Sequence, residues 1–202
     1  MKHLLSRAGL SLVEVTVVLS ALALVAGTLT PASLDLVQRA KDLQASRDAL
    51  SIRDAIVRLL DDAGAVRIGT RGTEGAIVEL LVSGGATPAS GDAGDWRWTR
   101  PVGADGLVDL LDRHLVTNEP GGSPANAWRG PARAGDLGWR GAYTHQGIGA
   151  DPWGRRYAVN VQFLLGRNEV IVLSAGPNGI IETPFEGRGL TGGGDDRVAL
   201  IK

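Results

Sequence analysis

The sequence contains no cysteine, which excludes disulfides, thiolate metal sites and cysteine nucleophiles together. This absence leaves the redox compartment undecided. Charge of one sign is not in excess either, because 21 Lys and Arg residues stand against 22 Asp and Glu residues, for a formal net charge of −1. Nucleic-acid-binding domains usually carry a basic patch, so we expect no nucleic-acid partner.

Residue patterns for catalysis and for metal binding by histidine are also missing. The three histidines, His3, His114 and His145, stand apart without the spacing of metal ligands. There is no G-x-S-x-G motif for a serine hydrolase. A G-x-G-x-x-G match at residues 187–192 neither follows a predicted strand nor opens a helix, so it is a loop. We therefore expect a protein that is not an enzyme.

One long apolar run dominates the N-terminal part of the chain. Residues 10–29 read LSLVEVTVVLSALALVAGTL, with Glu14 as the single charge. About 20 apolar residues are enough for a helix to span a bilayer. Lys2 and Arg7 precede the run, so the positive-inside rule keeps residues 1–9 in the cytoplasm and exports the rest. A cleaved signal peptide, a plain membrane anchor and a processed filament subunit all agree with these residues.

Residues 8–15, AGLSLVEV, resemble the class III signal of type IV pilins and of the pseudopilins of type II secretion. The resemblance implies that a prepilin peptidase cuts after Gly9, that the new N-terminal residue Leu10 is N-methylated, and that Glu14 serves filament assembly. Phenylalanine or methionine is more usual in the family where Leu10 stands. A free α-amine on Leu10 would be largely cationic, and Glu14 lies one helical turn further on the same face. The alternative for Glu14 is a side chain that reaches the lipid headgroups.

A helical period continues beyond the predicted span and defines two apolar stripes. The first contains Ala45, Ala49, Ile52, Ile56, Leu59, Leu60 and Ala63, and the second contains Leu36, Leu43, Leu50 and Val57. Two stripes need two partners, which we expect to be the chain's own head and neighbouring subunits; a single broad buried face is the alternative. Pro31 indicates either a kink or a break between two helices, and Gly64 suits a C-cap.

From residue 64 to residue 202 the sequence predicts a globular head of short strands between glycine-rich loops. We expect strands at 76–82, 157–165, 169–174 and 197–201, and a short helix with exposed acidic residues at 109–116. Trp96 and Trp98 are expected to anchor the loop 83–106, with a contact surface as the alternative. The predicted fold is α+β, with the long N-terminal helix packed on an antiparallel sheet.

Two segments of the head are similar to motifs of major pseudopilins. Residues 139–157 contain W-R-G-A-Y followed by D-P-W-G-R-R-Y, and residues 174–198 contain S-A-G-P-N-G followed by G-D-D-R-V. The second segment resembles a calcium-binding loop, and this resemblance implies a calcium ion within residues 176–196.

Oxygen-bearing side chains are frequent in that loop, and calcium takes 6–8 oxygen ligands. By motif position the expected ligands are Asn178, Asp195 and Asp196, with Ser174 less favoured. Glu182 and Glu186 carry further oxygens. Asn178 stands where the family often has aspartate, and the loop is longer than usual. A solvated acidic turn is the alternative.

The resemblance as a whole implies a pseudopilin closest to the major subunit of type II secretion. Residues 1–9 would be a leader, residues 10–63 a helix that spans the inner membrane over about 10–30, and residues 64–202 a periplasmic head. Its expected partners are further copies of itself, minor pseudopilins, the prepilin peptidase and the inner-membrane assembly platform. The periplasmic filament would drive protein export across the outer membrane. A type IV pilin for adhesion, motility or DNA uptake and a membrane-anchored enzyme or binding domain are the alternatives.

Overall fold

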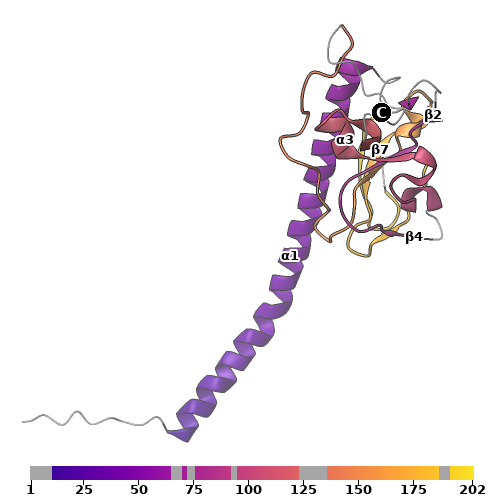
Figure 1. The fold of residues 1–202 in the computed structure, drawn as a ribbon. Coiled ribbons are helices and arrows are strands. Elements are labelled where there is room, and N and C mark those ends of the chain that lie inside the picture. Colours follow the sequence, from indigo (N-terminus) through magenta and orange to yellow (C-terminus); the bar gives the residue numbers. More distant parts are fainter. Residues whose placement is uncertain (1–10, 65–69, 72–75, 92–94, 123–135, 187–191) are drawn as a thin grey trace, which may run out of the picture. The chain divides into compact units, whose positions relative to one another are not determined.

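The computed structural model describes residues 11–64, 70–71, 76–91, 95–122, 136–186 and 192–202, with the backbone alone for residues 26–32, 70–71 and 76–77. The chain divides into two compact units, Met1–Ala40 and Lys41–Lys202. The first element, helix α1, has the bounds Leu12–Ala63 (Figure 1). The predicted leader and Leu10 lie outside the described residues.

Helix α1 is continuous in its backbone through Pro31, so the prediction of a break between two helices at this proline was wrong. Gly64 ends the helix with a φ of 78°, and its N–H donates to the carbonyl of Leu60 at 2.8 Å. A left-handed glycine is a common C-terminal stop, which confirms the predicted C-cap. Among the described residues, no helix combines the length and the apolar character that a membrane span requires.

A five-stranded sheet forms the centre of the second unit. Its order is β5 (Val108–Leu110), β3 (Leu80–Val82), β6 (Ala158–Val159), β7 (Ile171–Ser174) and β9 (Arg197–Leu200). The pairs β3–β6, β6–β7 and β7–β9 are antiparallel, whereas β3 and β5 are parallel. The sheet is therefore mixed, and the prediction of an antiparallel sheet was wrong for this pair. Residues 83–107 provide the long crossover that parallel neighbours need.

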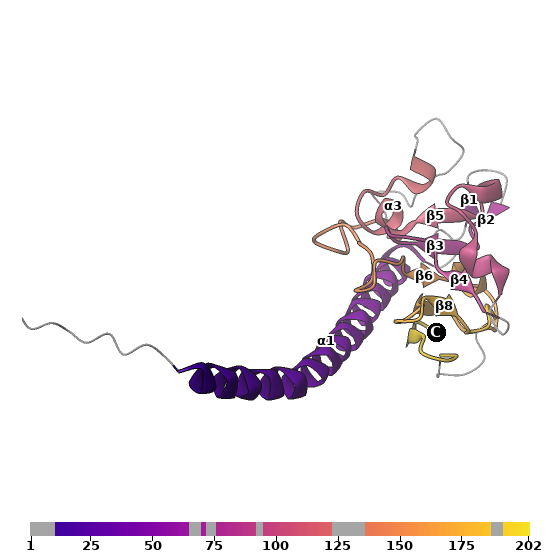
Figure 2. The same cartoon turned by 90° about the horizontal axis from the view of Figure 1, so that it is seen from below.

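Short elements surround the sheet (Figure 2). They are β1 (Thr70–Arg71), β2 (Ala76–Ile77), β4 (Ala89–Ser90), β8 (Ile180–Ile181), helix α3 (Leu111–Leu115) and the 3-10 turns η2 (Trp96–Thr99), η3 (Ala104–Gly106), η4 (Pro120–Gly122) and η5 (Val161–Phe163). The predicted strand at 76–82 is thus divided into β2 and β3. The predicted strand at 157–165 is β6 followed by η5, and the predicted helix at 109–116 is the end of β5 followed by α3.

Alternation along the strands sends apolar side chains to both faces of the sheet. On one face Leu81, Val159, Val172 and Ala199 belong to the same buried cluster as Ala49, Ile52, Ile56 and Leu59 of α1. On the other face Leu80, Val82, Ala158 and Leu173 belong to a cluster with Trp98, Ile181 and Phe185. The α+β class with a helix packed on the sheet is confirmed for the second unit.

The two neighbouring tryptophans of the 83–106 segment have different environments. Trp98 is fully buried, packs edge-on against Phe185 at 4.7 Å between ring centroids, and donates its indole N–H to the carbonyl of Thr183 at 2.9 Å. Trp96 is 66% exposed. The expectation of a buried anchor is confirmed for Trp98 and wrong for Trp96, because the 3-10 turn η2 points them in different directions.

Candidate functional site

The start of α1 is organised by Ser11 and Glu14. The backbone N–H of Ser11 donates to Glu14 Oε2 at 2.9 Å, and the N–H of Glu14 donates to Ser11 Oγ at 3.3 Å. This reciprocal pair is a capping box, which satisfies two of the backbone donors that a helix leaves open at its N-terminus. Gly9 and Leu10, the predicted cleavage and methylation positions, lie outside the described residues.

The capping box gives Glu14 a local role that its charge alone does not predict. The N–H of Ser11 belongs to the peptide bond that follows Leu10, so the carboxylate lies one residue along the chain from the amine that cleavage would create. The S-x-x-E pattern at residues 11–14 is a sequence signature of such a box. The role of Ser11 could therefore have been predicted from the sequence and was missed.

The first unit leaves its apolar side chains uncovered by the described part of the chain. Leu12 and Leu24 are 81% and 73% exposed, and Val13, Val15, Val17, Val18, Leu19, Leu22 and Val25 are exposed as well. Soluble monomers rarely expose a continuous apolar surface of this kind, which usually marks a contact with protein or lipid. We call residues 12–25 the apolar segment.

The two stripes predicted on α1 differ in burial. The first stripe is buried in the second unit except for Leu60, which is half-buried. In the second stripe Leu36, Leu43 and Leu50 are exposed and Val57 is half-buried. The prediction of two separate stripes is confirmed, and the alternative of a single broad buried face is wrong.

In the predicted calcium loop, the Asp195 carboxylate is bonded to the backbone of Asn178. The N–H of Asn178 donates to Asp195 Oδ2 at 3.1 Å, and Asn178 Oδ1 accepts from the N–H of Ile180 at 2.7 Å. The amide oxygen of Asn178 is thus engaged in a local turn. Asp195 Oδ1 is buried and has no hydrogen-bond partner among the described residues.

Asp196 is buried and uses only one carboxylate oxygen. Its Oδ2 accepts from the N–H groups of Glu182 and Thr183 at 2.9 and 2.8 Å and from the Thr183 hydroxyl at 2.6 Å. Its Oδ1 has no partner among the described residues. Burial raises the pKa of Asp196 above its ordinary value, against the opposing effect of the Thr183 hydrogen bonds.

The other candidate ligands point elsewhere. The Ser174 hydroxyl donates to Asp151 Oδ2 at 2.7 Å, Glu186 pairs with Arg97, and a carboxylate oxygen of Glu182 lies close against Gly194. Within the described residues, no group of three or more Asp, Glu or His side chains is placed to hold a metal ion. One carboxylate oxygen of Asp195 and one of Asp196 lack a hydrogen-bond partner among the described residues, and these two oxygens are free to bind a cation. Backbone carbonyls and water would have to supply the remaining ligands.

Asp109 is fully buried, so the prediction that it is exposed on a helix was wrong. Its carboxylate accepts from His114 Nε2 at 2.9 Å, from Arg113 at 2.8 Å and from the N–H groups of Leu110 and Gly121. Burial opposes its ionisation, but the hydrogen bond and charge of His114 and the two backbone donors outweigh burial and lower the pKa of Asp109. These donors come from β5, α3 and η4, so the buried carboxylate joins these three elements.

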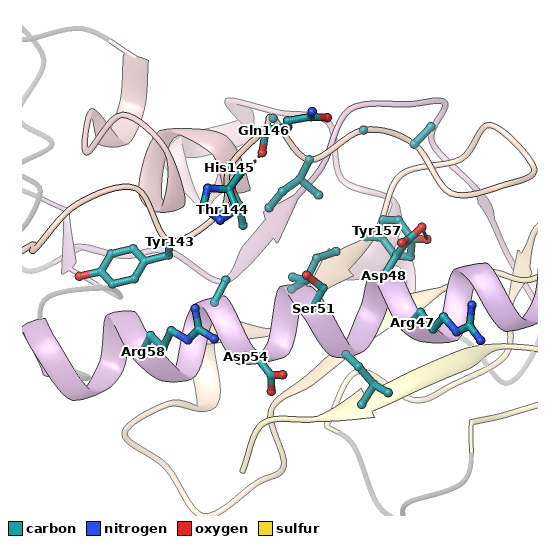
Figure 3. Close-up of a pocket in the computed structure, with 17 residues that line it drawn as sticks. Arg47, Asp48, Ser51, Asp54, Arg58, Tyr143, Thr144, His145, Gln146 and Tyr157 are labelled. Atoms are coloured by element: carbon teal, nitrogen blue, oxygen red, sulfur yellow. Dashed lines mark hydrogen bonds between the residues drawn. The ribbon is translucent and has the colours of Figure 1, made fainter.

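A groove lies between α1 and residues 143–150 of the second unit, and we call it the α1 groove (Figure 3). Its volume is about 840 Å³, within the range of ligand-binding pockets. Arg47, Ser51 and Arg58 line it from the helix, and His145 lines it from the facing loop. Sequence reasoning missed this groove because it depends on where the 143–150 loop returns to the helix.

Comparison of the chain with models of protein families, with curated proteins and with solved structures finds no match.

Proposed function

We propose that the chain is a structural subunit of a pseudopilus of the type II secretion kind, processed after Gly9 and assembled through α1. The observation that carries the proposal is the Ser11–Glu14 capping box at the head of an apolar segment whose described side chains are uncovered. Such a segment requires an apolar environment from outside the chain. The inner membrane before assembly and a bundle of neighbouring helices after it would supply that environment.

In this proposal Glu14 acts at the moment of assembly. A carboxylate without a partner is costly in a low-dielectric helix bundle, and a nearby cationic amine relieves this cost. The capping box keeps the carboxylate beside the first peptide bond of the processed chain, where the Leu10 α-amine of the same subunit or of a neighbour is the matching charge. The pairing sets the axial register of the subunits. The prepilin peptidase, minor pseudopilins and the assembly platform are the other proposed partners.

The proposed role of the head is to present a periplasmic surface while α1 polymerises. The filament would extend and push cargo through the outer membrane, so the chain has a structural role and no catalytic one. A strain that lacks the gene, assayed in parallel for secreted proteins and for surface pili, tests this role. Loss of secretion with intact pili supports the proposal. Loss of pili with normal secretion supports a type IV pilin instead.

Two substitutions at Glu14 separate its charge from its cap. Glutamine at this position still accepts from the Ser11 N–H, so Glu14→Gln removes the charge and keeps the capping box. We expect both Glu14→Gln and Glu14→Ala to insert into the membrane and to fail in filament assembly. Asp35→Asn, which removes an exposed carboxylate paired with Arg39 on the same helix, is the control and should assemble. Normal filaments from Glu14→Gln would overturn the proposed charge pairing.

Processing has its own test. The intact mass of the mature protein should correspond to a chain that begins at Leu10 and carries one additional methyl group. A mass that includes residues 1–9 would contradict cleavage after Gly9. A plain membrane anchor predicts that unprocessed mass.

We also propose that calcium binds at Asp195 and Asp196, as an ion that stabilises the loop. A ligand that binds the folded state raises its apparent stability, so calcium should raise the unfolding temperature and a chelator should reverse the rise. Asp195→Asn and Asp196→Asn should remove the response, and Asp61→Asn, at an exposed position of α1, should keep it. An unchanged unfolding temperature on adding calcium would reject this site.

The pH dependence of the calcium effect follows from the direction of the Asp196 pKa. The folded protein holds the Asp196 proton more tightly than the unfolded chain does. Without calcium, the stability of the folded state should therefore fall as pH rises from the ordinary aspartate pKa, near 4, through the raised pKa of the folded state. Calcium requires the ionised carboxylate. Its stabilising effect should therefore grow with pH across this window, while Asp196→Asn shows no growth.

A further inference from the structure

The α1 groove contains donors that no group of the described chain satisfies. Arg47 and Arg58 are exposed, and neither makes a hydrogen bond or an ion pair with another described residue. His145, on the opposite wall, is exposed and equally without a partner in the described part of the chain. Guanidinium groups are donors only, so a ligand of this groove must bring acceptors.

The acidic residues of the groove are already engaged. Asp48 accepts the hydroxyl of Tyr157 at 3.1 Å, and Asp54 accepts two bonds from Arg53 at 3.0 and 2.7 Å. Figure 3 shows Asp54 directed away from the 143–150 loop, whereas Arg58 rises toward it. Among the described residues, Asp48 has a neutral hydroxyl and no cation as its partner, so the unpaired guanidinium donors of the groove are Arg58 at one end and Arg47, beside Asp48, at the other.

The spacing of the two arginines restricts the size of the ligand. They lie eleven positions apart on α1, which places them on nearly the same face and about 16 Å apart along the helix axis. A single phosphate or carboxylate cannot reach both. An extended polypeptide advances about 3.3 Å per residue and sends alternate side chains to opposite faces, so two acidic side chains four residues apart share a face and lie about 13 Å apart. The flexible arginine side chains can reach across the remaining distance.

The middle of the groove is less polar than its ends. Leu50 is 42% exposed on the helix, and Ala55 and the half-buried Ile148 line the space beside it. An apolar side chain between the two acidic residues would cover this area. We propose that the α1 groove binds an extended acidic peptide segment of another protein, with one carboxylate at Arg47, one at Arg58 and an apolar residue between them.

The proposal goes beyond the filament role, since it holds for this unit whether or not α1 polymerises. It is tested on the full chain in micelles of a neutral detergent. The probe is the capped peptide acetyl-Glu-Ser-Leu-Ser-Glu-amide with a neutral fluorophore, in which both glutamates and the leucine share one face of the extended chain, and binding is measured by fluorescence anisotropy. The matched control peptide has glutamine in place of both glutamates.

We expect the acidic peptide to bind and the glutamine peptide to bind at least tenfold more weakly. Arg47→Gln and Arg58→Gln should each weaken binding by about threefold to tenfold, as expected for charge-assisted hydrogen bonds at a partly exposed site. Arg39→Gln, at an exposed arginine of α1 outside the groove, should leave binding unchanged. Raising the salt concentration should weaken binding to the native chain more than to the Arg47→Gln variant.

Three outcomes would overturn the proposal. They are no binding of the acidic peptide at millimolar concentration, equal binding of the two peptides, and binding that Arg39→Gln weakens as much as Arg58→Gln does. Vesicles with anionic lipids provide a further arm with the same variants. Vesicle binding that depends on Arg47 and Arg58 without any peptide binding would assign the groove to a lipid surface and overturn the peptide site.

Discussion

Helix α1 contains two apolar regions that are satisfied in different ways. Between residues 45 and 63 the apolar side chains follow one stripe, and the sheet of the same unit buries that stripe. Between residues 12 and 25 the apolar side chains lie on all sides of the helix, and every one of them is exposed. A stripe matches one flat partner, whereas an apolar surface all round requires an apolar surrounding medium. Periodicity, rather than apolarity alone, therefore distinguishes the part of α1 that packs on the sheet of its own unit from the part that the described chain leaves uncovered.

The largest expected effect comes from the buried stripe. Leu59→Ala should lower the free energy of unfolding of the second unit by about 2–5 kcal/mol, because it removes a fully buried side chain and leaves a cavity. Urea unfolding of the full chain in micelles, followed by tryptophan fluorescence, to which the buried Trp98 contributes, measures this loss. Leu43→Ala is the matched control: the same substitution on the same helix at a 59% exposed position should change stability by less than about 0.5 kcal/mol. Equal losses of stability from Leu59→Ala and Leu43→Ala would contradict the difference between the buried and the exposed positions of α1.

A smaller effect is expected where a tyrosine joins the sheet to α1. The Tyr157 hydroxyl donates to Asp48 at 3.1 Å, so Tyr157→Phe should cost about 1 kcal/mol at neutral pH. Burial, with the nearby Asp48 charge, raises the pKa of Tyr157 above its ordinary value, so the unfolded chain loses this proton first as pH rises above about 10. Stability should therefore fall with pH in the alkaline range.

The pH dependence of the stability of Tyr157→Phe tests whether Tyr157 causes the alkaline loss. Tyr157→Phe should show a smaller alkaline loss than the native chain, measured by urea unfolding between pH 8 and pH 11. Tyr143, whose hydroxyl donates to Asp62 at 3.0 Å, also has a pKa raised by burial and leaves a residual loss. A Tyr157→Phe profile that is identical to the native one would show that this tyrosine does not control the alkaline behaviour.

The smallest effect is local to the first turn of α1. Ser11→Ala removes one half of the capping box and should destabilise the first turn by about 1 kcal/mol. Hydrogen exchange of the amides of residues 13–15 should accelerate about fivefold, while global unfolding of the second unit stays the same. Ser20→Ala, which removes a hydroxyl bonded to the Thr16 carbonyl within the helix, should not accelerate this exchange. Equal acceleration by both variants would contradict a specific cap.

Local features of the chain were predictable from the sequence. The extent of α1, its two stripes and the Gly64 stop depend on residues within one or two helical turns of each other, and the structure has them as predicted. The antiparallel pairing of β6 with β7 also joins neighbouring segments, although residues 160–170, with η5 among them, connect the strands where a longer strand was predicted. In these elements, the secondary-structure propensity and the hydrophobic period of a short stretch of sequence decide the structure.

Features that join distant segments were not predictable. The burial of Asp109 depends on donors that α3 and η4 bring to it, so a carboxylate that looked exposed by period is internal. The α1 groove depends on a loop about 90 residues further along the chain. In the predicted calcium loop, the sequence indicated which oxygens are present but not how they are bonded. The Asn178 side-chain oxygen accepts from the backbone of Ile180, and the Ser174 hydroxyl donates to Asp151.

The position of β3 in the sheet has a consequence for the order of folding events. Its parallel partner β5 begins 28 residues after the first residue of β3, and its antiparallel partner β6 pairs Val159 with Leu81 across 78 positions. Helix α1 needs only local bonds and can form early, whereas β3 waits for both distant partners. A chain that stops before Ala158 leaves β3 with one open edge. Refolding from urea should therefore be limited by a slow pairing step, on a scale of milliseconds to seconds, that completes the sheet after the helix has formed.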